Sequence, residues 1–187
     1  MTNYIFQDTP LKNLQIIKNQ VVTDKRGFLS RLFCQGAMSN ILKEKRICQI
    51  NKTLTIKKGT VRGLHFQYPP YAETKIISCL KGKVWDVAVD LRKNSPTFLN
   101  YHAELLEEDN HKSFLIPEGF AHGFQALSSE CEMLYLHTAD YKKDFEGAIN
   151  ITDPRVGINW PEKISEISDR DSNHPMLSED FNGIEII

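Results

Sequence analysis

Short runs rich in Val, Ile, Phe and Tyr recur along the chain, and turn-forming residues separate them. The runs lie at 14–22, 47–55, 60–67, 75–80, 83–91, 98–105, 113–116 and 132–141. Breaks such as Lys57-Lys58-Gly59 and Tyr68-Pro69-Pro70 have the composition of tight turns, not of linkers. So many short strands predict an all-β sandwich or barrel, with minor helices at 37–45 and 161–167.

The run from Val84 to Leu91 alternates most clearly, with Trp85 and Val87 on one face and Asp86 and Asp90 on the other. We expect the apolar face to be part of the core, and the face with the two aspartates to be available for polar contacts. With 187 residues, of which 41% are hydrophobic, the chain can bury one substantial core. We therefore predict a single domain across 1–187.

Charge and targeting signals exclude several classes of protein. The formal net charge is -1, so no general field favours nucleic acid or an anionic membrane, and any anion site must be built locally. Neither a signal peptide nor an apolar run of about 18 residues is found, which predicts a cytoplasmic protein. The four cysteines form no close pair, which favours reduced thiols over a disulfide framework.

Two motifs carry groups suited to acid–base chemistry: Arg62-Gly63-Leu64-His65-Phe66-Gln67, with Lys75 downstream, and Pro117-Glu118-Gly119-Phe120-Ala121-His122-Gly123-Phe124. A strand histidine can take a proton from a carbon beside a carbonyl, while a lysine holds the negative charge that develops on oxygen. This pattern predicts enolisation chemistry.

A metal is the first alternative, because jelly-roll barrels often hold one on His-x-His with a later Glu and His. Here Gln67 occupies the second histidine position, and the later motif supplies only His122. Two imidazoles without a third donor at the expected place make a poor iron or zinc site, so we predict no catalytic metal.

The barrel motifs resemble the cupin superfamily and, more closely, the dTDP-4-dehydrorhamnose 3,5-epimerase family. The resemblance covers nearly the whole chain and includes Asp24-Lys25-Arg26-Gly27-Phe28, Gln49-x-Asn51, the two histidine motifs, Asp86 to Arg92, Ser95-Pro96-Thr97-Phe98, Tyr135, Asp153-Pro154, Trp160-Pro161 and Ser168-x-x-Asp171. It implies a cupin-type jelly-roll homodimer that acts on a nucleotide-linked 4-keto-6-deoxy sugar without a cofactor.

Residue by residue, the resemblance implies that His65 is the base, Lys75 the cation beside the 4-keto oxygen and Tyr135 the acid on the opposite face. Asp171 would orient His65, with Asp169 as the alternative. Because C3 and C5 both flank the C4 carbonyl, one enolate-stabilising site can serve both carbons. Outside this context the same residues would be an ordinary strand histidine, a barrel-lining aromatic and a capping acid.

The resemblance also implies a set of substrate-binding residues: Arg26, Phe28, Arg31, Gln49, Asn51, Arg62, His122 and Tyr141. Arg26 and Arg62 would bind the pyrophosphate, which suits the forked guanidinium. On an unbroken strand Arg62 and His65 point to opposite faces, so both can face the substrate only if Gly63 allows a bulge or one side chain serves a neighbouring site. His122 either contacts the substrate or pairs with Asp86.

Two departures from the family pattern affect the substrate. Arg31 stands near the position of a Glu beside the nucleotide base, and a donor-only side chain suits guanine acceptors better than thymine. Glu73-Thr74 replaces the usual Gln-Gly next to Lys75. The residues therefore leave open a dTDP, GDP or CDP sugar, and a hexose or heptose.

The sequence thus predicts a cofactor-free 3,5-epimerase of a nucleotide-diphosphate 4-keto-6-deoxy sugar. Its product would serve deoxysugar and surface polysaccharide biosynthesis, such as capsule or lipopolysaccharide. The alternatives are a C3-only epimerase, a 3,4-ketoisomerase of similar barrel form, and a silent cupin that binds a nucleotide sugar without turning it over.

Overall fold

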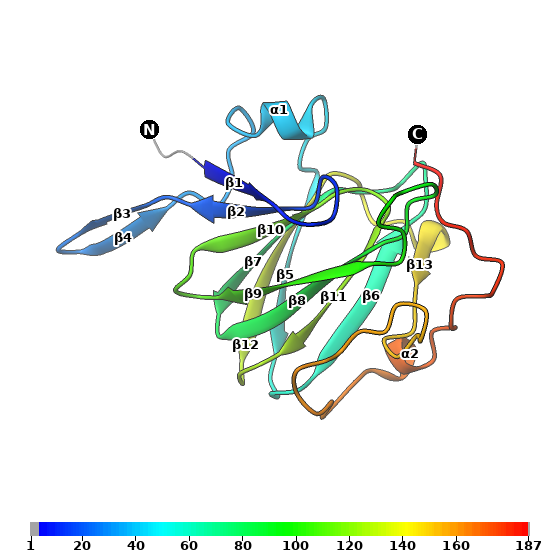
Figure 1. Ribbon diagram of the computed structural model, residues 1–187. Coiled ribbons are helices and arrows are strands. Elements are labelled where there is room, and N and C mark those ends of the chain that lie inside the picture. The colour runs from blue at the N-terminus through cyan, green and yellow to red at the C-terminus, as the bar shows by residue number, and fades with distance from the viewer. Residues whose placement is uncertain (1–3, 187) are drawn as a thin grey trace.

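Two antiparallel sheets face each other in a cupin-type jelly-roll barrel (Figure 1). The computed structural model describes residues 4–186. The strands are β1 (Tyr4–Asp8), β2 (Gln15–Asn19), β3 (Val21–Asp24), β4 (Gly27–Ser30), β5 (Gln49–Thr55), β6 (Val61–Gln67), β7 (Lys75–Lys81), β8 (Lys83–Asp90), β9 (Tyr101–Glu107), β10 (Lys112–Ile116), β11 (Phe120–Ala126), β12 (Cys131–His137) and β13 (Glu146–Ala148). The helices are α1 (Ser39–Leu42), α2 (Asp169–Ser172) and the 3-10 turn η1 (Lys143–Phe145).

The first sheet has the order β1-β2-β10-β7-β12-β5, and the second has the order β13-β6-β11-β8-β9. Between them lies an apolar core that includes Ile77, Phe114 and Phe124. The chain after β13 packs on the outer face of the second sheet, while the segment around α1 packs on the outer face of the first. Both sheets are therefore covered over much of both faces.

The β8 strand shows the consequence of this double cover. Trp85, Val87 and Val89 pack against the outer layer formed by the later chain, so the apolar face read from the sequence faces outward. Val84 and Ala88, on the same face as Asp86, are buried in the barrel core. The face that carries Asp86 is thus largely core as well.

The expected strands are confirmed with shifted ends, but one expected helix is wrong. The segment 161–167 is not helical, because its backbone pairs with the start of β6: the amide of Val61 donates to the carbonyl of Glu166 at 3.0 Å. The expected helix at 37–45 is present as the shorter α1. Cys79 and Cys131 are buried thiols as expected, whereas Cys48 is exposed.

The hairpin of β3 and β4 forms its own two-stranded sheet and extends away from the barrel (Figure 1). It carries three exposed apolar side chains, Val22, Phe28 and Leu29, the last two about two-thirds exposed at 65% and 66%. In the part of the chain that the structure describes, each helix falls short of the length and apolar character that a membrane crossing needs.

Candidate active site

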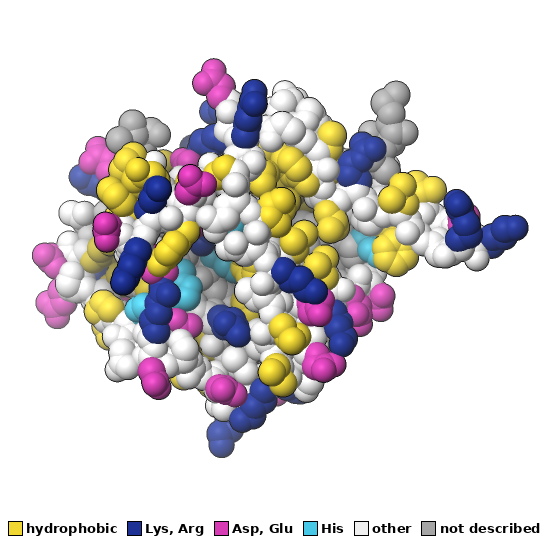
Figure 2. Space-filling model, turned by 180° about the vertical axis from the view of Figure 1, so that it is seen from behind, with side chains coloured by type: hydrophobic (Ala, Val, Ile, Leu, Met, Phe, Trp, Pro, Cys, Tyr) yellow, Lys and Arg dark blue, Asp and Glu magenta, His cyan; other side chains and the backbone are white. Residues whose placement is uncertain are grey.

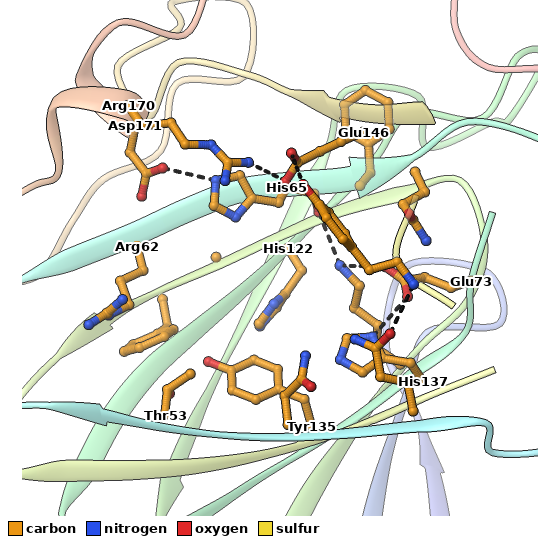
Figure 3. A pocket seen from close by; sticks show the side chains of 18 of the residues that line it. Thr53, Arg62, His65, Glu73, His122, Tyr135, His137, Glu146, Arg170 and Asp171 are labelled. Carbon is orange, nitrogen blue, oxygen red and sulfur yellow. Dashed lines mark hydrogen bonds and ion pairs between the residues drawn. The ribbon is translucent and has the colours of Figure 1, made fainter. Parts of the chain in front are cut away.

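A cavity of about 700 Å³ lies between the two sheets. Figure 2 shows histidine side chains inside a hollow of the surface, and Figure 3 shows the cavity from close by. Its lining comprises Gln49, Asn51, Thr53, Arg62, His65, Phe66, Gln67, Glu73, Lys75, His122, Gly123, Phe124, Tyr135, His137, Tyr141, Glu146, Ser168, Arg170 and Asp171. The structure thus brings most of the predicted site residues to one place.

The β6 strand places both Arg62 and His65 in this cavity, because its register against β11 shifts between them. Gly63 lies at the shift with a φ of 130°. A Cβ there would stand 2.5 Å from the Cα of Gly123, so no other residue fits without movement. Of the two alternatives that strand parity left open, the bulge at Gly63 is the one present.

His65 is held by the carboxylate of Asp171, with His65 Nε2 2.9 Å from Asp171 Oδ1. The other oxygen, Oδ2, accepts the amide hydrogen of Gly63 at 3.1 Å. Ser168 caps α2 by accepting the amide hydrogen of Asp171 at 3.1 Å, which fixes the acid in place. Asp171 is buried and Asp169 is exposed, so the geometry selects Asp171.

The electrostatics of this pair favour a charged acid. Burial alone would raise the pKa of Asp171, but the hydrogen bond and charge of His65 outweigh it and lower the pKa below its ordinary value. An ionised carboxylate on Nε2 fixes the proton there and leaves a lone pair on Nδ1. His65 is therefore oriented as a base.

Lys75 lies on the facing sheet and reaches across to β6. Its Nζ donates to the carbonyl of His65 at 3.3 Å and lies 3.2 Å from Glu73 Oε1. The side chains of Lys75 and Glu73 are 9% and 8% exposed. An ammonium has three N–H donors, so two identified acceptors leave one for a ligand.

Tyr135 also comes from the first sheet and faces the β6 wall (Figure 3). Burial raises the pKa of Tyr135, so the phenol keeps its proton at neutral pH. Its ring lies 6.0 Å from that of His122, whose Nε2 is 2.8 Å from Asp86 Oδ1. The pairing of His122 with Asp86 is confirmed, and burial raises the pKa of Asp86.

The comparisons with known proteins agree with this geometry. A family model described as dTDP-4-dehydrorhamnose 3,5-epimerase matches residues 8–179. The chain belongs to this family. Its members are epimerases, so the protein is an isomerase. Over 182 aligned residues, 38% are identical to those of the dTDP-4-dehydrorhamnose 3,5-epimerase of Methanothermobacter thermautotrophicus, and the alignment covers 96% of this chain and 97% of that one.

Solved structures of the family share the fold. The dTDP-4-dehydrorhamnose 3,5-epimerase of Elizabethkingia anophelis superposes with a TM-score of 0.89 at 34% identity, over 96% of this chain and 99% of that one. The dTDP-6-deoxy-D-glucose-3,5-epimerase of Legionella pneumophila, in complex with dTDP-4-keto-L-rhamnose, gives 0.87 at 34% identity, over 93% of each chain. The predicted family, fold class and epimerase activity are confirmed.

The remaining predicted binding residues divide into two groups. Gln49, Asn51 and Tyr141 line the epimerase cavity, and the amide of Tyr141 donates to Gln49 Oε1 at 2.9 Å. Arg26 and Phe28 lie on the projecting hairpin and Arg31 just beyond it, and none of the three lines the cavity. These three residues, which were predicted to bind the substrate, thus lie away from the cavity of their own chain.

Sequence reasoning missed a histidine beside the predicted lysine. His137 follows Tyr135 by two residues on β12, so strand parity was the signal that could have found it. Its Nδ1 lies 2.8 Å from Glu73 Oε2. Burial alone would raise the pKa of Glu73, but the charge of Lys75 and the hydrogen bond with His137 outweigh it and lower the pKa.

A second missed histidine lies beside the base. The ring of His174 is 5.5 Å from that of His65, in an edge-to-face arrangement. Burial lowers the pKa of His174. Together with Asp171, these histidines form the group of potential metal ligands found among the described residues. This group differs from the His-x-His pattern considered for a catalytic metal.

Proposed function

We propose that the chain is a single-domain, cofactor-free 3,5-epimerase of a dTDP-linked 4-keto-6-deoxy sugar in deoxysugar biosynthesis. The observation that carries the proposal is the placement of an oriented base, His65, and a protonated phenol, Tyr135, on facing sheets, with Lys75 reaching between them. A sugar ring bound in the cavity has the base on one face and the acid on the other. Inversion at a carbon requires this arrangement.

The reaction follows from these positions. The Nδ1 lone pair of His65 takes the proton from C3 or C5. The electron pair of the broken C–H bond forms a C=C bond to C4, and the π pair of the carbonyl moves onto the C4 oxygen, which gives an enolate. The remaining N–H of Lys75 stabilises that oxygen. Tyr135 then gives a proton to the same carbon from the opposite face, and solvent restores the phenol and the imidazole.

The nucleotide is proposed to be dTDP because the family and the two structural neighbours named above carry that substrate class in their names. Arg31, like Arg26 and Phe28, does not line the cavity of its own chain, so the cavity adds no observation in favour of guanine. The C3-only epimerase, the ketoisomerase and the silent cupin are less favoured, because the chain belongs to the 3,5-epimerase family and retains both the base and the acid.

The proposed activity can be tested in heavy water with dTDP- and GDP-linked 4-keto-6-deoxy sugars, followed by NMR. We expect deuterium at both C3 and C5 of the dTDP sugar, together with inversion at both carbons, and slower exchange with the GDP sugar. Exchange at C3 alone would indicate a C3 epimerase, and movement of the carbonyl to C3 a ketoisomerase. Binding without any exchange would leave only the silent cupin.

We also propose a cytoplasmic homodimer in which the hairpin of one protomer completes the cavity of the other. Among the strands that the structure describes, β3 and β4 pair only with each other, and the hairpin exposes Phe28 and Leu29. Exposed apolar side chains on a projecting element are typical of a protein interface. Arg26 and Phe28 would then contact the nucleotide of the partner, which reconciles their predicted role with their distance from the cavity.

Complementation between two inactive proteins tests this arrangement. One variant carries His65→Ala, and the other carries Arg26→Ala with Phe28→Ala. If the hairpin acts in trans, a mixed dimer has one site with an intact base and an intact hairpin. Co-expression in equal amounts should restore about a quarter of wild-type activity, since half the dimers are mixed and each has one complete site. No gain over the separate variants would show that the hairpin does not serve a partner.

A further inference from the structure

We propose that His65, Asp171 and His174 form a zinc-binding site whose occupation blocks the epimerase. His65 Nε2 and His174 Nε2 lie 2.9 and 3.5 Å from the same oxygen, Asp171 Oδ1. All three ligand atoms lie within 4.8 Å of one another. The site thus offers two imidazole nitrogens and one carboxylate oxygen around a common point.

These separations suit zinc. With Zn–N and Zn–O bonds of about 2.0–2.2 Å, the ligand atoms of a tetrahedral site lie about 3.3–3.5 Å apart. The two distances to Asp171 Oδ1 require adjustments of a few tenths of an ångström. Two histidines and one acid are also a ligand set that zinc accepts while keeping a fourth position open.

The missing hydrogen bond of His174 Nε2 is an independent observation that points to a ligand. This nitrogen is buried and makes no hydrogen bond within residues 4–186, and its 3.5 Å contact with Asp171 Oδ1 is a long polar contact. A buried imidazole nitrogen without a partner loses the free energy of its hydrogen bond to water. A metal ion would satisfy it, and the proposed reaction assigns this histidine no other task.

The surroundings hold the ligands in place. Asp171 Oδ2 is occupied by the amide of Gly63, which leaves Oδ1 for the ion. The side-chain amide of Asn150 donates to the carbonyl of His174 at 2.9 Å and fixes its backbone. The neighbouring cation Arg170 is paired with Glu146, which offsets its repulsion of a metal ion.

A bound zinc ion would inhibit the enzyme, because the ion and the reaction both need His65. A zinc-bound His65 must give up the proton on Nε2, so the proton moves to Nδ1. The lone pair that would take the C3 or C5 proton is then lost. This consequence rests on the proposed function, whereas the binding of zinc does not.

Zinc binding is tested first without turnover, by equilibrium dialysis with zinc alone and by the visible absorption of Co²⁺ as a probe. The wild type should bind one ion per chain with a tetrahedral Co²⁺ spectrum, and His174→Ala should bind at least about tenfold more weakly, since loss of an outer partner alone costs about 10–100-fold. His174→Ala has the same cysteines as the wild type. Any zinc bound by thiols is therefore equal in the two proteins and does not affect the comparison.

Epimerisation then tests the blockade. Zinc should inhibit the wild type, EDTA should reverse it, and His174→Ala should keep its basal rate but need at least about tenfold more zinc for half inhibition. His102→Ala is the matched control, because His102 lies 3.8 Å from Glu104 without a second histidine. Equal zinc binding by wild type and His174→Ala would overturn the site, and binding without inhibition would overturn the blockade.

Discussion

His65→Ala is expected to lower epimerisation about 10²–10⁴-fold and to remove deuterium exchange at both C3 and C5, because loss of a general base commonly costs this much. The side chain is partly exposed inside the cavity, and within residues 4–186 it hydrogen-bonds to Asp171 alone. The barrel core does not depend on it. The rates are measured by NMR in heavy water, and the thermal midpoint should stay close to that of the wild type.

Two neighbouring acids provide the control for this prediction. Asp171→Ala should reduce the rate by removing the group that orients His65, whereas Asp169→Ala should leave it near wild type, since Asp169 is exposed and outside the cavity. If exchange in His65→Ala continued at the wild-type rate, another residue would be the base. Equal effects of the two acid variants would contradict the orienting role of Asp171.

Tyr135→Phe is expected to separate exchange from inversion. His65 would still remove the protons and return solvent deuterium to its own face, so exchange should persist. Inversion should fall about 10²–10⁴-fold, because the opposite face loses its proton donor. The substitution removes one oxygen from a half-buried ring and keeps its apolar contacts with the core. Both quantities come from one NMR time course in heavy water.

Tyr141→Phe is the matched control, since Tyr141 also lines the cavity but is exposed and donates its hydroxyl hydrogen to Glu146 at 2.9 Å. Whatever its effect on substrate binding, it should keep the wild-type ratio of inversion to exchange, because Tyr141 is not the proposed proton donor. Parallel loss of exchange and inversion in Tyr135→Phe would mean that the phenol positions the substrate and does not protonate it.

The strands were predictable where one face differs from the other in polarity. The segment 120–126 shows the limit, because every residue of β11 is buried and alternation therefore carries no signal. The run 14–22 was read as one strand, yet the chain leaves the barrel after β2 and begins the projecting hairpin. The composition of the run does not predict such a change in the direction of the chain.

The false helix at 161–167 has a similar cause. Its carbonyl at Glu166 pairs with Val61, and its amide at Ser165 pairs with the carbonyl of Gly59, both more than a hundred residues away along the chain. Long-range backbone pairing thus replaced the local helix that propensity favoured. The short helix α2 starts at Asp169, two residues after the end of this segment, and Ser168 caps it.

The all-β class, the candidate base, lysine and phenol, and the parity conflict at Gly63 all follow from the amino-acid sequence. Four features depend on the three-dimensional structure. Asp171 is the acid that contacts His65, and His174 lies beside it. Glu73 lies between Lys75 and His137, and the hairpin lies away from the cavity of its own chain. The physical reason is that sheet register and the packing of the later chain bring together side chains separated by tens to more than a hundred positions. Composition and periodicity describe neighbours along the chain, whereas these contacts depend on neighbours in space.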